Sequence, residues 1–383
     1  MLILNIPSII VACNDPGGTM AIIPIIHRLR SDKNINTLVF GGKHAQKIFK
    51  NKSISYKKIS SYGSSRITRG LIDSILSIEA PILVLTSTSF GKSIDNAFFD
   101  RAIAKNIKTF VLIDQWGNYS MRFSKFNENK NFKYLPDYIG LMDEFAKKEM
   151  IEEGFPEERL IIIGHPFLDS LIKKDVSIHE RKLFCDSLNI KSDGILIVFA
   201  SEPFKAKDTA KDLERIGYTD TIILQYLAKC LKEISEETKQ YINLVIKIHP
   251  RDDRNTESFS CNVKSKYLNT TITKNGDASQ FIQNADIVTG MSSIFLVQSF
   301  LLNKPTINIQ IGRKSKDELI TNKLCLTKAI TSSDELLKAL RHLIMNKNYL
   351  HVYHNQNIMK MDGKATDRAI MFIENILHGQ SPV

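Results

Sequence analysis

Short apolar runs recur along this chain, and segments with the spacing of amphipathic helices separate them. Ile195–Ala200 is the clearest of these runs, and Ser8–Cys13 is another. A continuous apolar run of this length fits a strand that is buried on both faces, as the strands of parallel sheets are. Strands that alternate with helices imply right-handed crossovers between parallel neighbours. The chain is therefore predicted to fold as an α/β protein.

The alternation is interrupted once, at Gly164–Asp169, and then restarts. A chain of 383 residues also exceeds the size at which single cores usually stop growing. We expect two Rossmann-like domains with parallel sheets facing an interdomain cleft, a layout that resembles the fold called GT-B. The first domain, on the acceptor side, would span 1–168 and the nucleotide-sugar-binding domain 169–362. A C-terminal helix at 363–383 would pack back across the junction.

The individual strands and the first turn can be located from the same pattern. Asn14 to Thr19 is predicted to be a glycine-rich turn after the first strand. The strands are expected at residues 8–13, 36–40, 81–85, 109–113, 138–141 and 160–163, and then at 195–200, 244–248, 270–273, 285–289 and 305–310.

Composition argues against membrane-spanning and disulfide-rich classes. The apolar runs are far shorter than the roughly 20 residues that a spanning helix needs. The N-terminus lacks the basic start and small-residue cleavage site of a signal peptide, so we expect a cytoplasmic protein. The five cysteines show no Cys-x-x-Cys spacing and are expected to be reduced thiols, without a zinc site or a disulfide framework.

The formal net charge is +11. The basic residues are spread along the chain without a nucleic-acid-binding motif, so no nucleic-acid partner is expected. A basic balance favours anionic substrates and peripheral association with the anionic inner membrane surface. A lysine-rich, solvated surface explains the same charge, because lysine is mostly an exposed residue.

Two polar signals end apolar runs in the second half of the chain. One is Lys247-Ile248-His249-Pro250 and the other is Gly290-Met291-Ser292-Ser293. Ligands of open parallel sheets bind outside the carboxyl ends of the strands, so both turns are expected to face one crevice. The His249 imidazole can donate to a phosphate oxygen, and Pro250 restricts the conformation of His249.

The serine pair stands where a strand passes into a helix. One of Ser292 and Ser293 is expected to cap the helix, and the other to bind an anion that Gly290 allows to approach. Ser201 and Glu202 follow the Ile195–Ala200 run and would contact the nucleotide or the sugar in the same crevice. Gln298, about one helical turn beyond the serines, is placed to reach a ribose hydroxyl or a base edge.

Carboxylates follow strands in the first half as well. Transfer of a sugar needs a general base that takes the proton of the acceptor hydroxyl. Asp114 is the first candidate for this base and Asp15 the second, with turn capping as the alternative role of both. Asp252-Asp253 reads as a solvated loop, and no Asp-x-Asp-like triplet marks a metal site, so metal dependence is not expected.

Together these motifs resemble those of bacterial GT-B glycosyltransferases that use CMP-activated ulosonic acids: sialyltransferases, polysialyltransferases and Kdo transferases. The shared marks are a Lys-x-His-Pro turn, matched by Lys247–Pro250, and a later serine pair, matched by Ser292-Ser293. An acidic residue near a glycine is matched loosely by Asp114–Gly117. The resemblance implies that His249 and the serines bind the CMP phosphate and stabilise the leaving group, and that Asp114 deprotonates an acceptor.

That acceptor would be a bacterial surface glycan or glycolipid, as in capsule or lipopolysaccharide synthesis, and no cofactor besides the nucleotide sugar is implied. Three other functions remain open. The GT-B architecture also houses non-hydrolysing UDP-sugar 2-epimerases, which need acid/base carboxylates and no acceptor. A CDP-glycerol-type glycerophosphate transferase would handle cytidine nucleotides, and a non-catalytic protein would bind a nucleotide sugar without turning it over.

Overall fold

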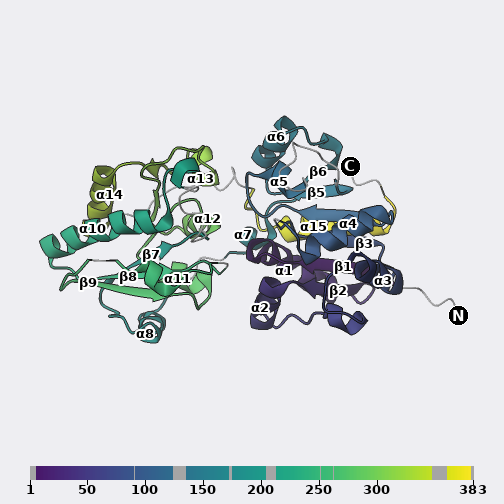
Figure 1. The fold of residues 1–383 in the computed structure, drawn as a ribbon, viewed down its shortest axis with the longest axis horizontal. Coiled ribbons are helices and arrows are strands. Elements are labelled where there is room, and N and C mark those ends of the chain that lie inside the picture. Colours follow the sequence, from purple (N-terminus) through teal and green to yellow (C-terminus); the bar gives the residue numbers. More distant parts are fainter. Residues whose placement is uncertain are drawn as a thin grey trace. The chain divides into compact units, whose positions relative to one another are not determined.

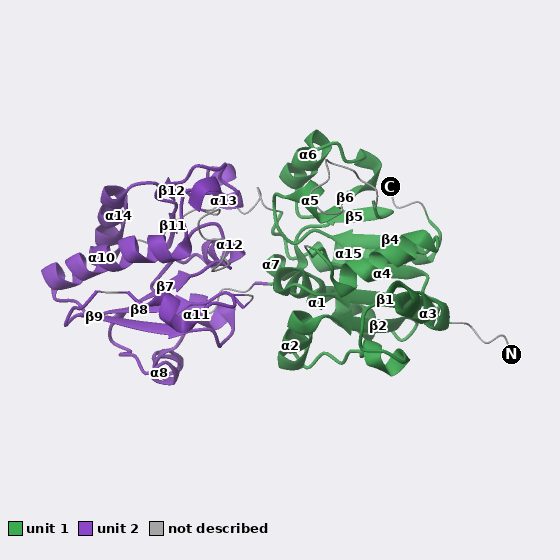
Figure 2. Cartoon of the chain, in the orientation of Figure 1, with its two compact units in different colours: residues 1–170, 355–383 green, residues 171–354 purple. Residues whose placement is uncertain are grey.

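The computed structural model describes residues 6–89, 91–123, 135–171, 175–203, 213–250, 252–261, 263–346 and 360–380. The chain divides into two compact units, unit 1 with residues 1–170 and 355–383 and unit 2 with residues 171–354 (Figure 2). Each unit contains one six-stranded sheet in which every neighbouring pair of strands is parallel. The predicted α/β class with two parallel sheets is confirmed.

The sheet of unit 1 has the strand order β2-β1-β3-β4-β5-β6. After β1 the chain adds β2 on one side and then β3 on the other, so the strand order reverses between β1 and β3. Ligands of open α/β sheets bind at such a switch point. The strands are β1 (Ser8–Cys13), β2 (Asn36–Gly41), β3 (Leu83–Thr86), β4 (Lys108–Leu112), β5 (Tyr138–Leu141) and β6 (Leu160–Ile162).

Helices cover both faces of this sheet. Successive side chains of β1 point to opposite faces, and those on each face pack against helices. Ile9 and Val11 pack in a cluster with α1 and α15, whereas Ile10 and Ala12 pack in a cluster with α3 and α4. Figure 1 shows α15, in yellow, within unit 1. The helices are α1 (Pro16–Ser31), α2 (Lys43–Asn51), α3 (Arg69–Glu79), α4 (Ile94–Ala104), α5 (Tyr119–Phe123), α6 (Glu144–Glu152), α7 (Pro166–Asp169) and α15 (Ala365–Leu377).

Unit 2 repeats this plan with the strand order β12-β11-β10-β7-β8-β9. The order reverses between β7 and β10, which is the switch point of this sheet. The strands are β7 (Ile195–Ala200), β8 (Ile242–Lys247), β9 (Leu268–Thr273), β10 (Ile287–Gly290), β11 (Thr306–Ile309) and β12 (Ala329–Ile330). The helices are α8 (Ile178–Ser187), α10 (Asp220–Thr238), α11 (Ala278–Asn284), α12 (Ile294–Leu301), α13 (Ile320–Lys323) and α14 (Ser333–Met345).

The glycine-rich turn predicted after β1 is shorter than expected. Helix α1 already begins at Pro16, with Asp15 as its N-cap, because proline at the first helical position has a suitable φ and needs no hydrogen-bonded N–H. Gly18 belongs to this first turn, where a Cβ would lie 2.5 Å from the Cβ of Ser87. The glycine therefore permits close packing of α1 against the loop after β3.

The two-residue strand β12 was not predicted. None of the helices within the described ranges is long and apolar enough to cross a membrane.

Candidate functional site

Two polar turns meet at the switch point of unit 2. Ser201 and Glu202 follow β7, and Ser292 and Ser293 follow β10, the strand beside it. The Ser292 backbone N–H donates to Oε1 of Glu202 at 2.5 Å, and the Ser292 hydroxyl donates to the two carboxylate oxygens at 3.1 and 3.2 Å. Glu202 and Ser292, which are 90 positions apart, are thus hydrogen-bonded at the carboxyl end of the sheet, where open α/β sheets bind their ligands.

Helix α12 begins beside this contact. Ser293 is its N-cap, and the Ser293 hydroxyl oxygen accepts from the Phe295 N–H at 3.2 Å. The backbone approaches closely at Gly290, where a Cβ would lie 3.2 Å from the Ala200 carbonyl oxygen. The first N–H groups of a helix have no intrahelical partner and carry partial positive charge, so this end of α12 favours an anion.

Glu202 is only partly exposed, and its carboxyl group has a pKa raised to about 7. Burial is the main cause, because it disfavours the charged form. The hydrogen bonds from Ser292 act in the opposite direction, and the nearby Asp220 carboxylate raises the pKa further. Both ionisation states of Glu202 are therefore populated at neutral pH.

A buried arginine connects the loops around Glu202. Arg254 donates to both carboxylate oxygens of Asp220 at 2.8 and 2.6 Å, and to Oδ2 of Asp252 at 2.5 Å. It also donates to the Glu202 carbonyl oxygen at 3.1 Å. The prediction of a solvated Asp252-Asp253 loop is wrong for Asp252, which is 2% exposed, because Arg254 draws its carboxylate inward. Sequence reasoning missed this cluster, since Asp220 lies 34 residues before Arg254.

The Lys247–Pro250 turn contacts the turns after both neighbouring strands, β7 and β9. The His249 backbone N–H donates to the Ser201 hydroxyl oxygen at 2.9 Å, which ties the β8 turn to the β7 turn. Because β8 and β10 lie on opposite sides of β7, His249 and Ser292 stand two strands apart, about 10 Å. The Lys247 ammonium donates to the Lys274 carbonyl at 2.8 Å, on the side of β8 away from the serines, and burial lowers its pKa to about 8.

Gln298 and Pro250 complete the residues predicted for unit 2. The Gln298 side chain on α12 is 7% exposed and makes no hydrogen bond within the described part of the chain, so its amide could still serve a ligand. Pro250 is exposed directly after His249.

In unit 1, the switch point holds a buried carboxyl group that the sequence did not single out. Asp95, in the first turn of α4, accepts from the hydroxyls of Ser87 and Ser89 at 3.0 and 2.7 Å. The Ser89 hydroxyl oxygen in turn accepts from the Asp15 N–H at 3.3 Å. Burial raises the pKa of Asp95 to about 6, against these hydrogen bonds. The signal that could have revealed it is the run of hydroxyl residues from Thr86 to Ser89, directly after an apolar strand.

Asp114, the first candidate for the base, forms a buried ion pair. Its Oδ1 accepts from Nη1 of Arg122 at 2.9 Å, and the two side chains are 11% and 3% exposed. Arg122 also donates to the Thr88 hydroxyl oxygen at 2.6 Å. Asp114 is thus held beside the β3 loop, on the edge of the sheet that also carries Asp15. Whether Asp114 or Asp15 is the base stays a prediction.

His165 supports the Asp114 loop. Its Nδ1 accepts from the Leu168 N–H at 3.3 Å, which caps α7, and its Nε2 lies 3.1 Å from the Asp114 carbonyl oxygen. Burial lowers the pKa of His165, so the ring is neutral at pH 7 and Nε2 carries the proton donated to that carbonyl. The residue is therefore a structural anchor of the loop after β4.

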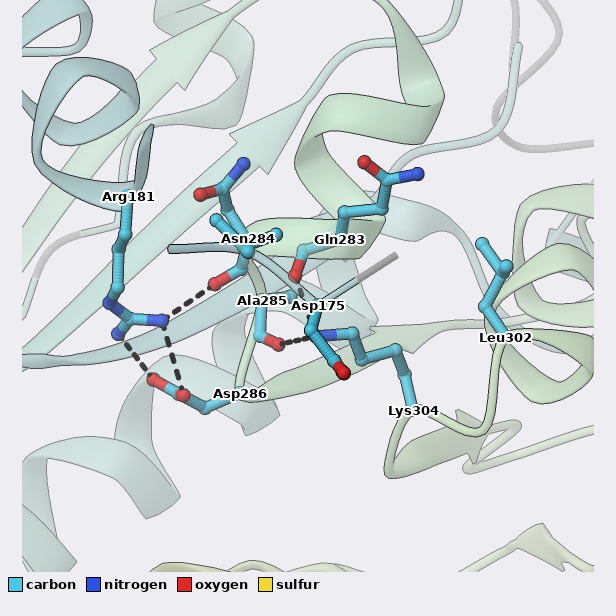
Figure 3. A pocket seen from close by; sticks show the side chains of 9 residues that line it. Asp175, Arg181, Gln283, Asn284, Ala285, Asp286, Leu302 and Lys304 are labelled. Carbon is cyan, nitrogen blue, oxygen red and sulfur yellow. Dashed lines mark hydrogen bonds and ion pairs between the residues drawn. The ribbon is translucent and has the colours of Figure 1, made fainter. Parts of the chain in front are cut away.

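A cavity of about 160 Å³ lies at the opposite, amino end of the unit 2 sheet (Figure 3). Its two cations, Arg181 and Lys304, donate to the backbone carbonyls of residues 283–285 at the end of α11. Arg181 also pairs with Asp286 at 2.7 Å. These contacts stabilise the C-terminus of α11, so the cavity is not the candidate site. No group of three or more His, Cys, Asp or Glu residues in the described ranges is arranged to hold a metal ion.

No protein-family model and no curated protein matches the chain, whereas solved structures match nearly all of it. UDP-GlcNAc 2-epimerase from Methanocaldococcus jannaschii matches with a TM-score of 0.65 and 17% identity, over 96% of this chain and 99% of that one. The Neisseria meningitidis enzyme of the same name, bound to UDP-GlcNAc, gives 0.65 and 13% over 97% and 100%. MurG from Acinetobacter baumannii gives 0.51 and 11% over 96% and 100%.

These matches confirm the GT-B fold and correct the predicted kinship. The epimerases contradict the resemblance to CMP-dependent sialyl-, polysialyl- and Kdo transferases, and with it the CMP donor and the link to capsule or lipopolysaccharide synthesis. The His-Pro turn and the serine pair lie at strand ends of this fold and do not by themselves specify which nucleotide binds, so the inference of a CMP donor was wrong. Structures named UDP-GlcNAc 2-epimerases share this fold, so the fold is compatible with the alternative of a UDP-sugar 2-epimerase.

Proposed function

We propose that this chain is a UDP-sugar 2-epimerase acting on UDP-N-acetylglucosamine or a close analogue. The observation that carries the proposal is a likeness that extends over 96% or more of the chain to structures named UDP-GlcNAc 2-epimerases. The names of several include UDP or UDP-GlcNAc as the bound molecule. MurG shares the fold with a lower TM-score, so a sugar transfer reaction has weaker support.

In this proposal the nucleotide binds at the carboxyl edge of the unit 2 sheet. Ser292, Ser293 and the N-terminus of α12 would take the phosphates, because they combine hydroxyls, N–H groups and the positive end of a helix dipole. Gln298 would reach the ribose or the base, since its buried amide lacks a protein partner in the described residues. His249, on the other side of β7, would donate to a phosphate oxygen.

Inversion at C2 of the sugar breaks and reforms a C–H bond, so it needs groups that remove and return a proton. Asp15 and Asp114 are the candidates, because both follow strands of unit 1 next to its switch point. The reaction needs no acceptor, and this proposal therefore leaves out the glycan acceptor expected from the sequence.

The test is incubation of the purified chain with UDP-N-acetylglucosamine alone in D₂O. The expected result is the C2 epimer, with deuterium at C2, detected by proton NMR. Asp15→Asn and Asp114→Asn should each slow turnover by about 10²–10⁴-fold, the usual contribution of a general acid or base. Asp186→Asn, on the exposed face of α8, is the matched control and should keep full activity. Release of UDP without the epimer would reject the proposal.

A further inference from the structure

Glu202 already occupies the place that the proposed site offers to a phosphate. Its carboxylate accepts from the Ser292 N–H and from the Ser292 hydroxyl, the same donors that a phosphate oxygen would use. While the Ser292 nitrogen lies 2.5 Å from Oε1 of Glu202, its N–H cannot also donate to a phosphate oxygen. A side chain of the chain itself thus uses the donors of the proposed site, and a ligand must compete with that side chain.

The surroundings of Glu202 favour its neutral form. In the described residues its carboxylate forms no ion pair, and its charged neighbour is the Asp220 carboxylate on α10. Arg254, from the turn after β8, forms ion pairs with Asp220 and Asp252. It contacts Glu202 at the backbone carbonyl and not at the carboxylate. The negative charge of an ionised Glu202 is therefore not balanced by a paired cation in the described residues.

Four other titratable side chains lie near this region, on neighbouring elements. Tyr218, before α10, is buried, and its pKa is raised by burial, so it stays neutral. Arg313 and Asp317, after β11, pair with each other at 2.6 Å. His249 is joined through its backbone to Ser201. None of these supplies Glu202 with a hydrogen-bonded cation in the described part of the chain, whereas protonation turns its carboxyl group into a donor.

We propose that Glu202 couples ligand binding to protonation. As a carboxylate it accepts from the Ser292 donors, and as a neutral acid it donates to the bound phosphate. Where Glu202 is ionised, binding would then transfer one proton from solvent to it, form one O–H bond and pass the Ser292 donors to the phosphate. The inference rests on the proposed nucleotide site. It does not require that the chain epimerise anything.

The experiment is calorimetric titration with UDP, and with pyrophosphate as a probe that lacks the nucleoside, between pH 6.5 and 8.5. Wild-type affinity should fall about 20- to 30-fold over this range, because a group titrating near pH 7 must be protonated to bind. Glu202→Gln keeps a donor without a titratable proton and should bind with a pH dependence that reflects the ligand alone. Glu236→Gln, on the exposed side of α10, is the control and should behave as wild type.

Proton uptake is measured directly by repeating the wild-type titration at pH 7.5 in two buffers of different ionisation enthalpy. This measurement needs no variant, so it tests the inference even where Glu202→Gln fails to fold. Proton release, or the same pH profile for wild type and Glu202→Gln, would overturn it, as would the failure of both anions to bind. UDP binding with proton uptake but no epimer would reject the proposed reaction and leave the role of Glu202 standing.

Discussion

A side chain at Gly17 would collide with Asp114, because a Cβ there would lie 2.4 Å from Oδ2 of that carboxylate. The first turn of α1 therefore contacts the loop after β4 through the backbone of Gly17 and the carboxylate of Asp114. Asp114 cannot easily turn away, since its Oδ1 is held by Arg122 at 2.9 Å. The position of the Asp114 side chain in its ion pair with Arg122 therefore requires a glycine at position 17.

Gly17→Ala should destabilise the chain by about 1–3 kcal/mol, the usual cost of overpacking a filled site. It should also lower any activity that depends on Asp114. Gly70→Ala is the control, because Gly70 lies in α3 with no atom within 4 Å of an added Cβ. That change should stabilise the chain by about 0.5–1 kcal/mol, as Ala does over Gly in helices. Urea unfolding of both variants measures the difference, and equal effects would contradict the predicted collision.

Arg122→Met should destabilise the chain by about 3–5 kcal/mol, because it leaves the Asp114 carboxylate buried without its partner. Adding Asp114→Asn to that variant should restore part of the loss, since the unpaired charge is then removed. The measurement is a double-mutant cycle by chemical denaturation. Strictly additive effects would show that the two side chains do not interact in solution.

Arg254→Met should be among the most damaging single changes in unit 2, again about 3–5 kcal/mol, because it strands the buried carboxylates of Asp220 and Asp252. Arg341→Met offers the matched comparison. Arg341 also contacts two carboxylates, those of Glu233 and Glu237, but these are about half exposed, so its loss should cost no more than about 1 kcal/mol. Thermal unfolding that ranks the two variants in the opposite order would refute this assignment.

The buried carboxyl of Asp95 should make stability depend on pH. Its pKa is about 6 in the folded chain against 3.8 for an unperturbed aspartate, so the folded state binds more protons between these values. Stability from this group is therefore complete below about pH 4 and falls as pH rises through 6, by about 3 kcal/mol in total.

Asp95→Asn removes this dependence and should gain stability relative to wild type as the pH rises from 4 to 7. Urea unfolding of both proteins at each pH gives the difference, in which the titration of all other groups cancels. A difference that stays constant over this range would show that Asp95 does not titrate there.

Local sequence determined much of the fold. The apolar runs at 8–13 and 195–200 are β1 and β7, and the cap at Ser293 is readable from a hydroxyl residue ahead of an apolar helical run. Such signals lie within a few residues of the structure they specify. The strand Ala329–Ile330 was missed because two residues carry no periodicity.

The tertiary structure alone decided which polar groups meet. Glu202 reaches Ser292 because β10 pairs with β7, and Asp252 is buried because Arg254 also binds Asp220. Residues that are 34 or 90 positions apart become neighbours through strand order and packing, which no local spacing encodes. The sequence by itself determined the alternating α/β plan and the turns that carry polar residues. Strand order decided which of those residues share a site, since that order is set by the packing of whole layers.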